Sequence, residues 1–220
     1  MKRALSTQVS LSAIAILGVA AFTELSNFSV ASYGLTAGSK TSATATLISM
    51  PKSPIPVVAF TSSNASVAQV PLSKLASSNG TVVIDVTGVA PGCAQIKASY
   101  GGRNRIDDVV VHPAAATTAF TMKVPDQVLP YPGLSDGSLT KTVSLSSDSP
   151  VGRGTLTINR AVWRLSSSNT SVVTVPDSVT QISTTTTFKI SGKGEGCATI
   201  TARLGTASVS KTVMTRYIGG

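Results

Sequence analysis

The sequence contains the same two blocks twice, in the same order. The first reads Ser-Ser-Asn-Ala-Ser-Val-Ala-Gln-Val-Pro at 62–71 and returns as Ser-Ser-Asn-Thr-Ser-Val-Val-Thr-Val-Pro at 167–176, 105 positions later. The second has a glycine, three residues and then Gly-Cys-Ala; it begins at Gly88 and returns at Gly192, 104 positions later. Two separated blocks that recur with one residue of drift indicate a duplicated folding unit of about one hundred residues.

The boundary between the two units is expected near Pro113. Proline has no backbone N–H to donate to a sheet, so a last strand should end there. A short run of alanine and threonine follows, which is typical of a linker. We therefore expect two domains, at residues 23–113 and 114–220, arranged end to end.

The pattern of side chains predicts strands throughout both units. Only 12% of the residues are charged, mean hydropathy is +0.28, and β-branched residues are frequent, which favours sheet over helix and over disorder. Short segments alternate apolar with hydroxyl or charged residues and are bounded by Gly, Pro, Asn or Ser, as half-buried strands are. The clearest of these segments are 41–48, 81–86, 94–100, 139–145, 158–165, 184–191 and 198–204. This spacing predicts an all-β fold of two tandem β-sandwiches.

The first residues have the pattern of a secretory signal peptide. Lys2 and Arg3 precede an apolar run at 9–21 that ends in small residues. The run is shorter than the roughly 20 residues of a spanning helix, although an uncleaved membrane anchor is the alternative. We expect residues 1–21 to be removed and the protein to be exported, as a secreted, periplasmic or cell-surface protein that does not span the membrane.

The repeated blocks resemble a known family. A large apolar residue (Phe60 or Leu165), the Ser-Ser-Asn block, a strand, and Gly-x-x-x-Gly-x-Ala-x-Ile together are similar to the bacterial immunoglobulin-like domain of group 2, found in intimin- and invasin-type adhesins. The resemblance covers nearly the whole mature chain, twice. A cysteine departs from the pattern where the family has a hydroxyl or small residue, at Cys93 and Cys197. The resemblance implies immunoglobulin-like sandwiches that space or display something at a cell surface, and no shared active site.

The two cysteines occupy equivalent places, one in each unit. By alternation Cys93 should point away from the core that Ala94 and Ile96 line, and Cys197 likewise. Equivalent points of two sandwiches placed end to end should lie tens of ångströms apart, beyond the roughly 4.4–6.8 Å between Cα atoms that a disulfide allows. We therefore expect unbridged cysteines or, as the alternative, intermolecular bridges; pairing within the chain would require side-by-side packing.

No catalytic, cofactor or metal site is predicted. His112 is the only histidine and should be a solvent-exposed residue between the domains. Asp107 and Asp108 with Asp126 offer a weak candidate for a calcium clamp at the domain junction, because their spacing is not that of a ligand loop. The protein is therefore expected to be non-enzymatic.

One candidate binding site is electrostatic. The formal net charge is +9, and from Ala114 onward ten Lys and Arg face five Asp and Glu. If Trp163 points inward, Arg160 and Arg164 share the outward face of their strand, and Arg203 points outward from its neighbour. Such a face would attract anionic glycans, envelope polymers or other polyanions, while a merely solvated face is the alternative. No basic helix, aromatic platform or zinc module indicates sequence-specific nucleic-acid binding.

Two functions follow from these features. The first is a surface or secreted binding and scaffolding module, adhesive toward an anionic glycan, an envelope polymer or a protein. The alternative is a structural subunit that associates with itself into a filament or layer, through edge strands or cysteine bridges.

Overall fold

A computed structural model describes residues 23–50, 53–114, 120–123, 129–130, 140–147, 161–181 and 185–216. The predicted signal peptide lies outside these residues. The described part of the chain consists of strands and turns, without a helix, so the predicted all-β class is confirmed. Within the same part, no helix is long and apolar enough to cross a membrane.

The first unit is a sandwich of two sheets. One sheet has four strands in the order β1-β3-β7-β5, and the other has five in the order β2-β9-β8-β4-β6. All neighbours are antiparallel except β2 and β9, which run parallel. The strands are β1 (Glu24–Val30), β2 (Gly34–Thr36), β3 (Lys40–Ile48), β4 (Val57–Ser62), β5 (Ala68–Gln69), β6 (Ser73–Leu75), β7 (Thr81–Gly88), β8 (Gly92–Tyr100) and β9 (Arg103–His112).

The second unit repeats this topology. Its sheets have the orders β10-β12-β16-β14 and β11-β18-β17-β13-β15, and the parallel pair returns as β11 and β18. From β4 to β7 the chain passes from one sheet to the other with each successive strand, and it does the same from β13 to β16. The strands are β10 (Phe120–Lys123), β11 (Leu129–Pro130), β12 (Thr140–Ser147), β13 (Ala161–Ser167), β14 (Val173–Thr174), β15 (Ser178–Gln181), β16 (Thr185–Gly192), β17 (Gly196–Leu204) and β18 (Ala207–Arg216).

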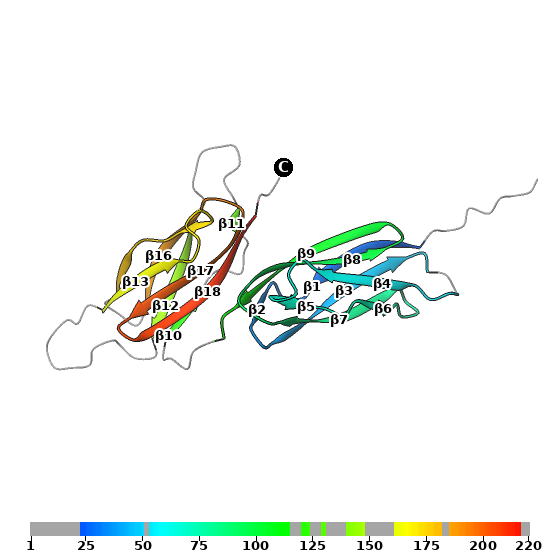
Figure 1. Ribbon diagram of the computed structural model, residues 1–220, viewed down its shortest axis with the longest axis horizontal. Coiled ribbons are helices and arrows are strands. Elements are labelled where there is room, and N and C mark those ends of the chain that lie inside the picture. The colour runs from blue at the N-terminus through cyan, green and yellow to red at the C-terminus, as the bar shows by residue number, and fades with distance from the viewer. Residues whose placement is uncertain are drawn as a thin grey trace, which may run out of the picture.

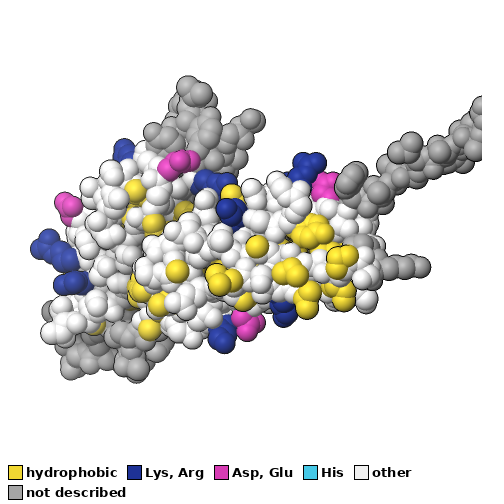
Figure 2. Space-filling view, turned by 45° about the vertical axis from the view of Figure 1, so that its right-hand side comes forward, with side chains coloured by type: hydrophobic (Ala, Val, Ile, Leu, Met, Phe, Trp, Pro, Cys, Tyr) yellow, Lys and Arg dark blue, Asp and Glu magenta, His cyan; other side chains and the backbone are white. Residues whose placement is uncertain are grey.

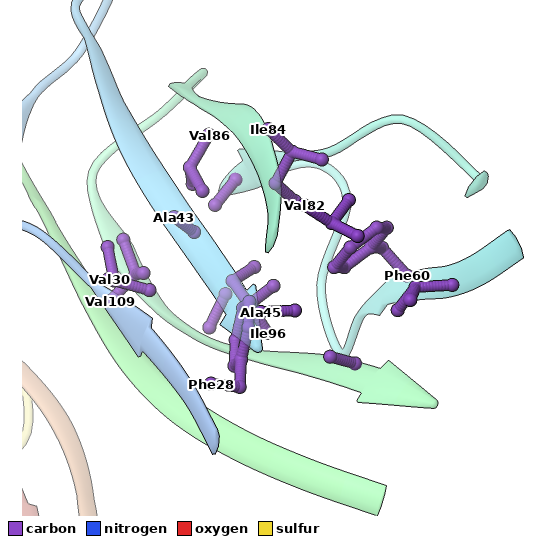
Figure 3. Packing of buried hydrophobic residues seen from close by; sticks show 14 of the residues in the cluster. Phe28, Val30, Ala43, Ala45, Phe60, Val82, Ile84, Val86, Ile96 and Val109 are labelled. Carbon is purple, nitrogen blue, oxygen red and sulfur yellow. The ribbon is translucent and has the colours of Figure 1, made fainter. Parts of the chain in front are cut away.

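The core of the first unit lies between its two sheets. Phe28 and Phe60 approach with ring centroids 6.1 Å apart, and Ile84 and Ile96 come from opposite sheets to the same interior (Figure 3). Along β4, β7 and β8, buried residues alternate with exposed or half-buried ones. This is the period-two pattern expected from the sequence, because successive side chains of a strand point to opposite faces.

The core of the second unit replaces one apolar pair with a hydrogen bond. Val58 and Ala76 are buried in the first unit, and their counterparts 105 positions later are Trp163 and Gln181. Both counterparts are buried, and the Trp163 indole N–H donates to Gln181 Oε1 at 2.6 Å. The larger ring thus fills the sandwich while its polar edge is satisfied internally.

The two units meet at equivalent ends. In the first unit the start of β8 and the end of β9 are paired, and they lie against the start of β17 and the end of β18 in the second unit. Figure 1 shows β18 beside the first unit, next to the end of β9. The expectation that equivalent points lie far apart is therefore wrong: it assumed a repeat related by translation, whereas here matching ends face each other.

Candidate functional site

The predicted basic face is built on β13 and β17. Trp163 and Leu165 are buried, so Arg164 between them points out of the sandwich, and Arg203 does the same beside buried Ala202. Arg164 and Arg203 are direct cross-strand partners in the antiparallel pair. The structure therefore brings two of the three predicted arginines together on one exposed face. Arg160, the third, lies outside the described residues.

Hydroxyl side chains lie next to this arginine pair, beside Arg203 and along one side of the pair. Arg203 of β17 has Arg164 as its cross-strand partner on one side and Ser208 of β18 as its partner on the other. The next row on the same face consists of Ser166, Thr201 and Ser210, and the hydroxyls of Thr201 and Ser210 lie 2.9 Å apart. We refer to these six residues as the basic face: Arg164, Ser166, Arg203, Thr201, Ser208 and Ser210.

The basic face combines charge with hydrogen-bonding groups. Like charges directly opposite each other on a sheet are destabilising. Neither Arg164 nor Arg203 forms an ion pair with an acidic residue in the described part of the chain. An anion placed between the two guanidinium groups would relieve the repulsion and accept hydrogen bonds from the planar donors and from the hydroxyls beside them.

The cysteines form a disulfide between the two units. Cys93 and Cys197 stand at the starts of β8 and β17, and their Cα atoms are 5.9 Å apart. They point away from their own cores, as the alternation predicted, because Ala94 and Ala198 are buried. The prediction of unbridged or intermolecular cysteines is contradicted. Pairing within the chain is possible because equivalent ends of the two sandwiches meet.

Two polar contacts accompany the disulfide. The Arg216 guanidinium donates to the Asp108 carboxylate at 2.5 Å, and Gln95 donates to the other oxygen of Asp108 at 3.2 Å. The backbone N–H of Thr212 donates to Nδ1 of His112 at 3.3 Å. Asp108 and Thr212 are 4% and 2% exposed although each lies on the outer face of its sheet. The other unit is what covers them.

These contacts correct two expectations about the junction. His112 is half-buried against the second unit rather than solvent-exposed. Asp107 accepts hydrogen bonds from the backbone of Val30 and Asp108, and Asp108 pairs with Arg216, so both carboxylates are engaged by the protein. Asp126 lies outside the described residues. No cluster of three metal-ligating side chains occurs in the described ranges.

An open cleft of about 410 Å³ follows the junction. Residues of both units line it, among them Ser63, Gln95, Glu195 and Met214 beside the disulfide. Sequence reasoning missed this junction and the role of Arg216. The available signal was the placement of one cysteine at the same position of each unit, because equivalent cysteines can pair if the units are related by a two-fold rotation.

No family model and no curated protein matches this chain. Solved structures do resemble it at low sequence identity. The D0-D1 domain of intimin is 12% identical over 88% of this chain and 99% of that one, with a TM-score of 0.42. Domains 4 and 5 of the S-layer protein SbsC are 19% identical over 88% and 96%, with a TM-score of 0.33. The Yersinia pseudotuberculosis adhesin InvE is 15% identical over 87% of this chain, which spans 59% of InvE, with a TM-score of 0.33. Intimin and InvE are proteins of the kind that the repeated blocks resemble.

Proposed function

We propose that this chain is an exported, non-enzymatic binding and scaffolding module of the cell surface that holds anionic polymers on the basic face. The single observation that supports this most is the cross-strand pair of Arg164 and Arg203. Both are exposed, and mutual repulsion makes the pair unfavourable in the absence of an anion. The neighbouring hydroxyl groups suit sulfate, phosphate or carboxylate groups repeated along a polymer.

The net positive charge of the second unit also favours an anionic polymer as the ligand. The second unit has most of the excess positive charge, which raises the local concentration of a polyanion near it. The basic face shares its sheet with the interdomain junction but lies farther along the strands, at the end of β17 rather than at its start. A long polymer can therefore lie along this face without displacing the first unit.

The test is binding of the full chain to immobilised heparin, with neutral dextran as the reference. We expect R164S/R203S to weaken heparin binding roughly tenfold to hundredfold, because two charge-assisted contacts are lost. The matched control is K189S/K193S, which removes the same charge from exposed positions on and beside β16, in the opposite sheet. Adding Arg160→Ser tests whether that residue belongs to the same face.

Two outcomes would overturn this proposal. One is equal heparin affinity of R164S/R203S and the unmodified chain. The other is an equal loss in the two double variants, since binding would then follow net charge alone. Binding that belongs to the basic face must also weaken steeply with added salt, because the contacts are exposed and screened.

The structural alternative is a subunit that associates through a sheet edge. Strand β6 is the outer strand of its five-stranded sheet, and all three of its residues are exposed. Leu75 and its cross-strand partner Val57 are 59% and 50% exposed, and nearby Leu72 is 84% exposed. Figure 2 shows hydrophobic side chains gathered on the visible face of the first unit. An exposed apolar edge of this kind can pair with another chain.

A further inference from the structure

The junction between the two units has an internal two-fold symmetry. Cys93 and Cys197 are equivalent positions, 104 residues apart. The same offset relates Asp108 to Thr212 and His112 to Arg216. The observed contacts join Asp108 to Arg216 and Thr212 to His112, so each contact is the counterpart of the other. In an isologous interface, which has two-fold symmetry, each contact between two positions is repeated with the two sides exchanged. The disulfide between equivalent cysteines and the two reciprocal contacts therefore indicate such an interface.

We propose that this interface also forms between two copies of the chain, by reciprocal exchange of domains. The first unit of one copy would pack against the second unit of another, and the reverse pair would close the dimer. Each exchanged junction would contain the same disulfide, the same Asp108–Arg216 ion pair and the same contact between Thr212 and His112. Because no contact is lost, the exchange costs little energy.

The exchange requires the connection between the units to join two different junctions. Strand β9 ends at His112 and β10 begins at Phe120, so residues 113–119 join the two units. Seven residues reach at most about 25 Å when fully extended, so this is the largest gap that the connection would have to bridge in the exchanged dimer. A short connection also gives the intrachain pair an effective concentration of the order of 1 mM. Monomers should therefore dominate in dilute solution, and exchanged dimers should appear when the chain itself approaches that concentration.

The disulfide bonds record the exchange without net oxidation. A thiolate of added glutathione attacks one sulfur of the Cys93–Cys197 bond, forming a mixed disulfide and releasing the other cysteine as a thiolate. That thiolate attacks the mixed disulfide of a second chain and expels glutathione. Two intrachain bonds thus become two interchain bonds, and the glutathione is recovered.

Charge reversal gives a direct test with the full chain. In D108R, arginines at positions 108 and 216 face each other; in R216D, two aspartates do. Only an exchanged heterodimer of the two variants restores an oppositely charged pair at both junctions. After co-refolding at about 1 mM with reduced and oxidised glutathione, we expect heterodimers at least tenfold more abundant than either homodimer. Native mass spectrometry measures these species.

The matched control is the pair D85R and K189D, which reverses exposed charges on the four-stranded sheets, away from the junction. A second measurement does not depend on variants: unmodified chains labelled with ¹⁴N and ¹⁵N are refolded together, and the Cys93–Cys197 peptides are mapped. Peptides of mixed isotope support the exchange. Their absence, or heterodimers no more frequent for the junction variants than for the control pair, would overturn it. Neither measurement of exchange involves heparin. If the chain does not bind heparin, the result for domain exchange is therefore unchanged.

Discussion

Two glycines of the first unit, Gly38 and Gly80, adopt the same left-handed backbone in different surroundings. Their φ angles are +86° and +80°. A Cβ at Gly38 would meet no atom within 4 Å, whereas one at Gly80 would lie 2.5 Å from the carbonyl oxygen of Leu47. That oxygen belongs to β3, so the turn before β7 packs directly on a strand of the same sheet.

An alanine at position 38 would strain the backbone only, whereas an alanine at position 80 would also clash with a neighbouring strand. We expect Gly38→Ala to lower the free energy of unfolding by about 1 kcal/mol, the cost of a left-handed alanine. Gly80→Ala should lower it by about 3 kcal/mol, because the turn must also shift away from β3. Urea denaturation followed by circular dichroism measures both. Equal losses would show that the turn yields freely and that the close approach to Leu47 has no energetic consequence.

At the scale of strands, the alternation of apolar and polar residues in the sequence predicted which side chains point into the sandwiches and which point outward. The inward positions of Ile84, Ile96 and Ile200 follow from period two, and so do the outward positions of Arg164 and Arg203. The short strands β2, β5 and β6 could not be predicted in this way, because two or three residues are too few to show a period. Their pairing depends on which sheet edge is free, and that is decided by tertiary packing.

Strand β6 also shows how an edge is protected. Lys74 is the cross-strand partner of buried Val58, so it points toward the gap between the sheets, and its Nζ donates to the carbonyl oxygen of Val83 at 2.7 Å. An inward-pointing charge on an edge strand discourages pairing with a second chain. We expect Lys74→Thr to increase self-association, measured by sedimentation velocity, while Lys189→Thr on the central strand β16 does not. Association that is the same in the two variants would exclude β6 as the contact.

At the scale of the whole molecule, the repeat predicted two copies of one fold but not the operation that relates them. Translation and two-fold rotation leave the same trace in a sequence, since both place equivalent residues at a constant offset. Besides the disulfide, two polar contacts in the described part of the chain distinguish the two operations: Asp108 with Arg216, and His112 with Thr212. The residue types at the equivalent positions differ: Asp108 corresponds to Thr212, and His112 corresponds to Arg216. The repeat in the sequence therefore could not reveal these contacts.

The disulfide should therefore be the main coupling between the units. When the second unit unfolds on a folded first unit, the bond still tethers both ends of the 85 residues from Pro113 to Cys197. Closing a loop of that length raises the free energy of the unfolded state by about 4.5 kcal/mol. We expect the double variant C93S/C197S to retain both folds while its second unit melts roughly 20 °C lower in scanning calorimetry. The single variant C93S should behave in the same way if the intrachain bond is the cause. An unchanged melting profile in both would mean that the two units are held together by their polar contacts alone.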